Sequence, residues 1–278
     1  MRNKTLWFSL ILSLTSAALA QEPVQPTIPR KTVEAVSPHA TQTCDVTYSS
    51  GTADTATKFC VTVNGNIPMF SVRGYELFPP AGNAADLEGY GFCDVTAGQL
   101  YLDYAAYDNG LWNASTLKQN GNTVTVTRTT SDGNWQLTQT IVNVPANASD
   151  VGSAKFTMKL KNLSNIGRAA TLLRYAAEDI TFDGTSTNVY NTTTQSASGQ
   201  FEYLAGLMIT VNSFPHDFDA VGYVQNIQSG PNPCNPYTNA VFNPPYEGQG
   251  SIVAVWQNSS IKTAPGAVLS VTGYYRPF

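Results

Sequence analysis

The feature that most constrains the fold is a two-residue alternation on both sides of one tight turn. The segments "NTVTVTRTT" and "WQLTQTIVNV" flank the turn Ser131–Asn134, whose sequence is "SDGN". Successive side chains of a β-strand point to opposite faces, and Asp-Gly is a strong hairpin signal. The sequence therefore predicts an antiparallel β-hairpin at this point.

The same alternation recurs from Cys44 to the last residue. Stretches such as "TKFCVTV", "GQLYLDYAAY", "AKFTMKLKN" and "GSIVAVWQ" predict roughly eleven strands, with few strong helix signals. That many strands in a chain of this length suit one domain with two packed sheets. We therefore expect an all-β fold over residues 44–278, a large two-sheet antiparallel β-sandwich, as a single domain.

The first residues carry the marks of a secretory leader. Arg2 and Lys4 precede the apolar run "LWFSLILSL", and "TSAALA" ends in a small-x-small pattern. We expect a signal peptide over residues 1–20 and a Pro-rich flexible tether over residues 21–43. No later apolar run is long enough to span a bilayer. These features predict a secreted protein, extracellular or periplasmic, without membrane insertion.

Charge narrows the range of partners. Removing the leader with its two cations changes the formal net charge from −4 to −6, and charged residues make up 12% of the chain against about 25% in typical proteins. The sequence shows no run of Lys and Arg. This composition argues against nucleic acid and against anionic membranes as partners. The oligomeric state stays open.

The four cysteines are Cys44, Cys60, Cys93 and Cys234. An even number in an oxidising compartment indicates two disulfides. We favour Cys44–Cys60, which closes a short loop, and Cys93–Cys234, which would pin the Pro-rich segment around Cys234. A metal site is disfavoured, because no C-x-x-C spacing or neighbouring histidine is present.

An acidic segment follows the apolar stretch "LLRYAA". Glu178, Asp179 and Asp183 come within six positions and precede Gly184. Several oxygens on a loop before a glycine are what calcium requires, although the spacing is not that of an EF-hand. A plain strand end followed by a turn is the simpler reading. Calcium is the only cofactor that we consider, and Arg174 is expected to pair with an acid nearby.

Aromatic side chains next to an acid suggest a sugar-binding surface. Tyr104, Tyr107, Asp108 and Trp112 lie close together in "YLDYAAYDNGLW". An aromatic ring can stack on the C–H face of a sugar while neighbouring polar groups bind its hydroxyls. The alternative is packing at the sandwich core, which we expect for Trp135 and Trp256 because they lie within strand patterns.

The segments "GYGFCD", "LYLDYAAYDNGLW", "TVTRTTSDGNWQLTQT", "MKLKNLSN" and "LLRYAAEDITFDGT" together resemble a group of uncharacterised exported bacterial β-proteins. No activity is assigned to that group, so the resemblance implies no catalytic residue. More loosely, the strands are similar to supersandwich folds such as galactose mutarotases and the accessory domains of polysaccharide lyases. Mutarotases use histidines and a glutamate. His216 has no matching motif around it here, so the resemblance implies a fold and not that activity.

Three functional hypotheses follow. The first is a secreted, non-catalytic binding or cell-surface protein with a glycan as its ligand, bound by Tyr104, Tyr107, Asp108 and Trp112. The second is a carbohydrate-active enzyme that uses Asp179, Asp183 or His216. The third is a structural extracellular protein without a small ligand. Convergent carboxylates in an aromatic groove would favour the enzyme, and an exposed aromatic strip would favour the binding protein.

Overall fold

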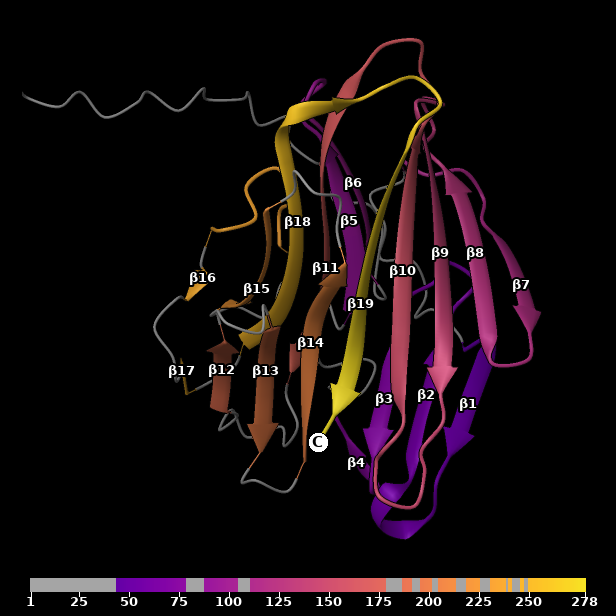
Figure 1. The fold of residues 1–278 in the computed structure, drawn as a ribbon, viewed down its shortest axis with the longest axis vertical. Helices are drawn as coiled ribbons and strands as arrows, with labels where there is room; N and C mark the ends of the chain where they lie inside the picture. The colour runs from indigo at the N-terminus through magenta and orange to yellow at the C-terminus, as the bar shows by residue number, and fades with distance from the viewer. Residues whose placement is uncertain are drawn as a thin grey trace, which may run out of the picture. The chain divides into compact units, whose positions relative to one another are not determined.

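The computed structural model describes residues 44–78, 88–104, 111–178, 187–191, 196–201, 205–213, 219–225, 231–238, 240–241, 246–247 and 250–278. These residues form nineteen β-strands and one turn of 3-10 helix, Ala53–Thr55. The strands assemble into three antiparallel sheets (Figure 1). The predicted all-β sandwich class is confirmed. No helix among the described residues is long and apolar enough to cross a membrane.

The largest sheet has nine strands in the order β17-β12-β13-β14-β19-β10-β9-β8-β7. The predicted hairpin is its β8–β9 pair, in which Thr129 lies opposite Gln136 and Gly133 adopts a positive φ of 71° in the turn. The bounds of these strands are β7 Thr116–Asn120, β8 Thr123–Thr129, β9 Trp135–Val144, β10 Ser153–Asn162, β12 Thr187–Asn191, β13 Ser196–Phe201, β14 Ala205–Ser213, β17 Tyr246–Glu247 and β19 Val268–Pro277.

The second sheet has six strands in the order β16-β15-β18-β11-β5-β6. Its central strands β11 and β18 pair over most of their length, from Ala170 opposite Asn258 to Glu178 opposite Gly250. These two strands are apolar on both faces, so the sheet is covered on both sides. The bounds are β5 Glu88–Asp94, β6 Gln99–Tyr104, β11 Arg168–Glu178, β15 Asp219–Gln225, β16 Ala240–Val241 and β18 Gly250–Thr263.

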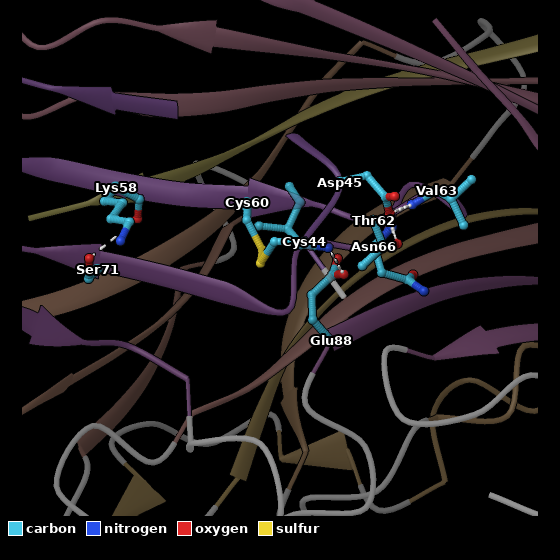
Figure 2. Close-up of a disulfide and its surroundings, with 10 residues drawn as sticks. Cys44, Asp45, Lys58, Cys60, Thr62, Val63, Asn66, Ser71 and Glu88 are labelled. Carbon is cyan, nitrogen blue, oxygen red and sulfur yellow. Dashed lines mark hydrogen bonds between the residues drawn. A yellow bond between two sulfur atoms is a disulfide. The ribbon is translucent and has the colours of Figure 1, made fainter. Parts of the chain in front are cut away.

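The third sheet is small and lies near the N-terminal end of the described chain. Its strands are β1 Val46–Ser50, β2 Thr57–Val61, β3 Met69–Val72 and β4 Tyr75–Glu76. The Cys44–Cys60 disulfide links the short segment before β1 to strand β2 (Figure 2). The Asp45 carboxylate accepts a hydrogen bond of 2.6 Å from the Val63 amide, which holds the same end of this sheet.

One apolar core joins the three sheets. Phe156 of the nine-stranded sheet packs edge-on against Trp256 of the six-stranded sheet, with ring centroids 6.2 Å apart. Phe78, which follows β4, packs against Tyr275 of β19 at 6.3 Å. Trp135 and Trp256 are fully buried, as predicted. The strands alternate inward apolar and outward polar residues because only one face of the nine-stranded sheet meets this core.

Candidate functional site

Trp112, predicted to form part of a sugar-stacking platform, belongs to the core. Its side chain is 8% exposed, and the indole N–H donates a hydrogen bond of 3.1 Å to the Leu102 carbonyl. The rings of Tyr90, Phe92 and Tyr101 contact it edge-on at centroid distances of 5.7–6.1 Å. A sugar needs an open ring face, so the platform expectation is corrected for this residue in favour of packing. The physical reason is that the backbone of Trp112 bridges Thr130, and its ring packs into the main apolar core.

Tyr104 is also inaccessible to a sugar, with 1% of its surface exposed. It lies on the face of the six-stranded sheet that points away from the main core, and its ring meets that of Tyr175 edge-on at 5.0 Å. Its hydroxyl donates a hydrogen bond of 2.8 Å to the Pro231 carbonyl. The platform expectation is therefore corrected for Tyr104 as well. Tyr107 and Asp108 lie outside the described residues.

The segment 231–238 covers this second face of the six-stranded sheet. Beneath it is a small apolar cluster made of Tyr104, Leu173, Tyr175, Val253 and Val255, against which Tyr237 packs. The Cys93–Cys234 disulfide ties the segment to β5, in the pairing favoured from the sequence. The Tyr104 ring occupies the space beside Gly89, where an added Cβ would lie 2.5 Å from a ring carbon. This disulfide therefore fixes the segment against the sheet.

The acidic segment is described only at its first residue. Glu178 is the last residue of β11, with its backbone opposite Gly250. Asp179, Asp183 and His216 lie outside the described residues. Within the described ranges, no group of three His, Cys, Asp or Glu side chains is placed to hold a metal ion. The calcium hypothesis at Glu178, Asp179 and Asp183 therefore remains a proposal.

The two strands that precede the candidate ligand-binding and metal-binding residues in the sequence, β6 and β11, end on the same side of the six-stranded sheet. In the antiparallel pairing of the six-stranded sheet, the ends of β6 at Tyr104 and of β11 at Glu178 share one edge with the start of β18 at Gly250. β6 and β11 are separated by β5 alone, and Tyr104 is level with Tyr175, three residues before Glu178, so the two ends lie about 14 Å apart. We call this sheet margin the Tyr104–Glu178 edge. The ends of β6 and β11 are far apart in the sequence, and the strand order of the sheet brings them close together.

Three ion pairs are buried within the sandwich, and the sequence indicated only that Arg174 would pair with an acid. Arg174 of β11 is fully buried and donates hydrogen bonds to Glu88 at 2.7 Å and to Gln139 at 3.0 Å. Glu88 also accepts from the Tyr275 hydroxyl at 2.9 Å and from the Ile67 amide at 2.6 Å. Burial is the largest single effect and would lower the pKa of the Arg174 guanidinium, but the charge and hydrogen-bond interactions with Glu88 and Tyr275 together outweigh burial and raise that pKa. This network joins all three sheets.

The second ion pair joins Asp103 of β6 to Arg128 of β8. Asp103 also accepts hydrogen bonds from the Asn66 amide at 2.7 Å and from the Tyr90 hydroxyl at 3.1 Å. The Arg128 guanidinium lies over the ring of Trp112, 5.1 Å from its centroid. Burial lowers the pKa of Arg128 from its usual range. The Asp103 carboxylate is thus bound by an arginine and by two further hydrogen-bond donors of the protein.

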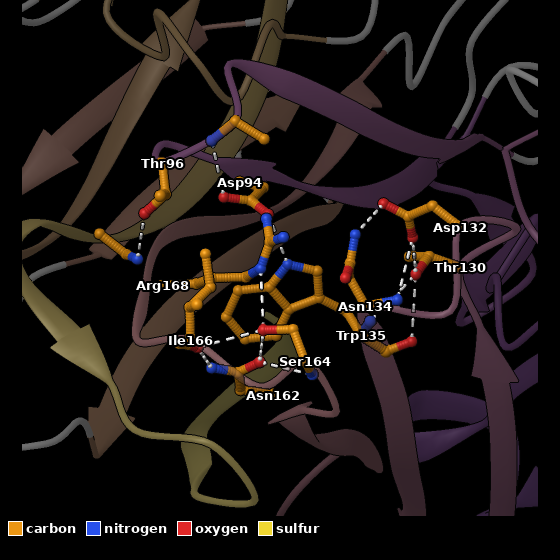
Figure 3. Close-up of polar contacts among 12 residues, drawn as sticks. Asp94, Thr96, Thr130, Asp132, Asn134, Trp135, Asn162, Ser164, Ile166 and Arg168 are labelled. Atoms are coloured by element: carbon orange, nitrogen blue, oxygen red, sulfur yellow. Dashed lines mark hydrogen bonds and ion pairs between the residues drawn. The ribbon is translucent and has the colours of Figure 1, made fainter.

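The third ion pair lies at the opposite end of the sandwich (Figure 3). Arg168 donates to Asp94 at 2.5 Å, and the Trp135 indole N–H donates to the same carboxylate at 2.9 Å. Asp132 lies in the nearby hairpin turn, where burial alone would raise its pKa. Hydrogen bonds from Thr130, Tyr101 and Asn134 outweigh burial and lower the pKa of Asp132 to about 2.

In the described interior, the charges of the buried carboxylates are neutralised by arginine side chains. Each buried carboxylate, Glu88, Asp94 or Asp103, has an arginine partner and further donors. Buried charges are tolerated when they are paired and hydrogen-bonded, and such groups stabilise one arrangement of the sheets. A sequence signal did exist. Arg128 and Arg174 occupy inward positions of strands whose other inward residues are apolar.

Comparisons with known proteins identify the fold alone. No family model and no curated protein matches the chain. A bacterial glucoamylase complexed with acarbose aligns with a TM-score of 0.51 and 10% identity, over 86% of this chain and 33% of the glucoamylase. A putative aldose 1-epimerase from Escherichia coli K12 aligns with a TM-score of 0.47 and 10% identity, over 84% of this chain and 99% of the epimerase. Heparan sulfate lyase HepC from Pedobacter heparinus aligns with a TM-score of 0.45 and 10% identity, over 84% and 34%. This chain thus spans about a third of the glucoamylase, whose similarity supports the sandwich fold.

Proposed function

We propose that the protein is a secreted, non-catalytic carbohydrate-binding protein that binds its ligand at the Tyr104–Glu178 edge. The observation that carries the proposal is the convergence of strand ends there. β6 and β11 end at this edge, and Tyr107, Asp108, Asp179 and Asp183 follow those two strand ends in the sequence. An aromatic ring and several carboxylates are groups that bind a sugar, and sheet ends are common places for binding loops.

One further observation favours a binding role over catalysis, and two others support a carbohydrate ligand and export. Every buried carboxylate that the structure describes is paired with an arginine, so none is a free acid or base. Glycoside hydrolysis needs two carboxyls across an accessible bond. The acarbose-complexed glucoamylase shares the fold, which makes a carbohydrate ligand the reasonable first choice. The leader-like start and two disulfides support an exported protein.

A glycan-array screen of residues 21–278 tests the proposal. We expect selective binding of a neutral oligosaccharide that is lost in Tyr107→Ala and Asp108→Ala variants. Tyr75→Ala is the matched control, because Tyr75 is an exposed tyrosine on the four-stranded sheet. Trp112→Ala is unsuitable, since that residue is part of the core. A blank array with folded protein, or equal loss in the control, would overturn the proposal and favour a structural role.

The second candidate function is a carbohydrate-active enzyme. It is favoured by the fold shared with a glucoamylase and by the two acids, Asp179 and Asp183, that follow the end of β11. Incubation with maltooligosaccharides and chromatography of the products tests it. Turnover that disappears in Asp179→Asn or Asp183→Asn would replace the binding proposal. The same variants, titrated with calcium by calorimetry, test the metal hypothesis at Glu178, Asp179 and Asp183.

A further inference from the structure

The outward face of the nine-stranded sheet carries several lysine and arginine side chains that are far apart in the sequence. β7, β8, β9, β10 and β19 lie side by side in this sheet (Figure 1). Alternation sends every second side chain of these strands away from the core. Five cations point outward: Lys118, Lys155, Lys159, Lys161 and Arg276. We call this surface the basic face.

The basic face carries no opposing charge. No Asp or Glu occupies any position of β7, β8, β9, β10 or β19. In the described part of the chain, ion pairs involve Arg128, Arg168 and Arg174 of the interior, and none of the five outward cations. The remaining surface cations described, Lys58, Arg73 and Lys262, lie on other elements. A chain with a formal net charge of −4 therefore presents one face of uniform positive sign.

Neutral hydroxyls fill the space between the cations. Thr272, Thr157, Thr140 and Thr125 lie opposite one another in a row across four neighbouring strands, and Lys118 ends the row on β7. The Thr157 and Thr272 hydroxyls are 3.0 Å apart, so the row is in mutual contact at that point. Each hydroxyl can donate or accept a hydrogen bond. The basic face thus combines positive charge with a row of threonine hydroxyls that can form hydrogen bonds with the hydroxyls of a sugar.

The cations at one end of the face are held in place by an aromatic ring. The Lys155 ammonium lies 5.6 Å and the Arg276 guanidinium 4.7 Å from the centroid of Tyr274. Cation–π contacts of this kind reduce the freedom of long side chains. From Lys155 to Lys161 the cations of β10 extend along about 20 Å, and Lys118 lies about 14 Å to the side. A ligand must be long to reach them all.

We propose that the basic face is a docking surface for a linear acidic polysaccharide. Charge complementarity selects a polyanion, and spacing over about 20 Å selects a polymer over a single anion. The row of threonine hydroxyls favours a ligand that has hydroxyl groups of its own, as a polysaccharide does. Duplex nucleic acid is read by elements that enter a groove, and single strands are bound by stacked aromatics. The basic face has neither, with Tyr274 already covered by its two cations. This surface is separate from the Tyr104–Glu178 edge, so the inference is independent of the proposed function.

The test measures binding of residues 21–278 to polygalacturonate by calorimetry at low salt. We expect binding that weakens steeply as NaCl is raised, because exposed charges are screened. A Lys155→Gln/Lys159→Gln variant should bind on the order of 2- to 30-fold more weakly, the range for losing two exposed ion pairs. Lys58→Gln/Lys262→Gln is the matched control, since it removes the same charge from exposed positions elsewhere, and it should bind like the parent protein.

Further ligands separate the alternatives. Heparin, a sulfated polysaccharide, should also bind, and dextran, a neutral one, should not. If the two double variants bound polygalacturonate equally weakly, the loss of affinity would be due to the change in net charge alone, and the proposal would be overturned. Absence of polygalacturonate and heparin binding, or preference for duplex DNA, would overturn it as well. Tyr107→Ala should leave polygalacturonate binding intact, and Lys155→Gln/Lys159→Gln should leave any neutral-glycan binding intact. Failure of one site is therefore distinguishable from failure of the other.

Discussion

Replacing Arg174 by methionine should be among the most damaging single changes in this protein. Methionine keeps most of the volume and the apolar stem but removes the guanidinium. Glu88 then stays fully buried as a carboxylate, with the Tyr275 hydroxyl and the Ile67 amide as its remaining donors. Gln139 and the Gly65 carbonyl also lose a donor at 3.0 and 3.1 Å. An unpaired buried charge is far more costly than an absent pair.

The expected loss is about 3–5 kcal/mol in the free energy of unfolding, the range for breaking a buried ion pair by removing one partner. That is a large part of the roughly 5–15 kcal/mol available to a folded protein. Glu88→Gln should also destabilise, because it leaves the guanidinium without its counter-charge. The double variant restores neutrality. Its cost should fall short of the sum of the single costs by about 1–3 kcal/mol, as for residues in direct contact.

Urea unfolding followed by tryptophan fluorescence measures these quantities, since Trp135 and Trp256 are buried in the same core. The midpoint gives the stability change when the denaturant slope is unaltered. Lys262→Met, at an exposed position, controls for loss of a surface cation. A cost below about 1 kcal/mol for Arg174→Met, or simple additivity in the double variant, would refute the reasoning that a charge-paired network joins the sheets.

Three more predictions rest on single observations. Trp112→Ala should cost about 3–5 kcal/mol in thermal or urea unfolding, because it empties a core site; near-wild-type stability would contradict its placement. Cys93→Ser/Cys234→Ser should cost about 2–5 kcal/mol and open the segment 231–238 to proteases, whereas unchanged melting and proteolysis would mean that the disulfide holds nothing in place. Asp132 has a folded-state pKa of about 2, below its unfolded value of about 3.9, so its stabilisation is present above about pH 4 and lost as the pH falls through 2. Since Asp132 is exposed, Asp132→Asn should lose about 1 kcal/mol or less near neutral pH and nothing at pH 2, and a pH-independent difference would exclude this linkage.

Much of the fold could be predicted because its signal is local. The alternation in "TVTVTRT" and "WQLTQTIV" specifies strands, and Asp132-Gly133 specifies the turn between them. One of the three possible disulfide pairings was favoured on loop length and on the position of Cys234 in a Pro-rich segment, and the structure contains that pairing. The assignment of Trp135 and Trp256 to the core followed from the same alternation.

The candidate site could be predicted less well. Tyr104 and Trp112 looked like a surface strip because they are near each other in sequence and next to polar residues. Their burial depends on the segment 231–238 and on Arg128, which approach from distant parts of the chain. Arg174 was expected near Glu178 or another acid, and its partner is Glu88, which lies 86 positions away.

The sequence by itself determined the all-β class and the hairpin at Ser131–Asn134, because alternation and turn chemistry act over short stretches. Only the tertiary structure decided which charges meet. Strand order brings Arg174 to Glu88 and Arg128 to Asp103. The same antiparallel register aligns Thr157, which lies between Lys155 and Lys159 on β10, with Thr272 and Thr140 of the neighbouring strands on one basic face. The physical reason is that cross-strand neighbours are set by register between distant segments, which no local pattern contains.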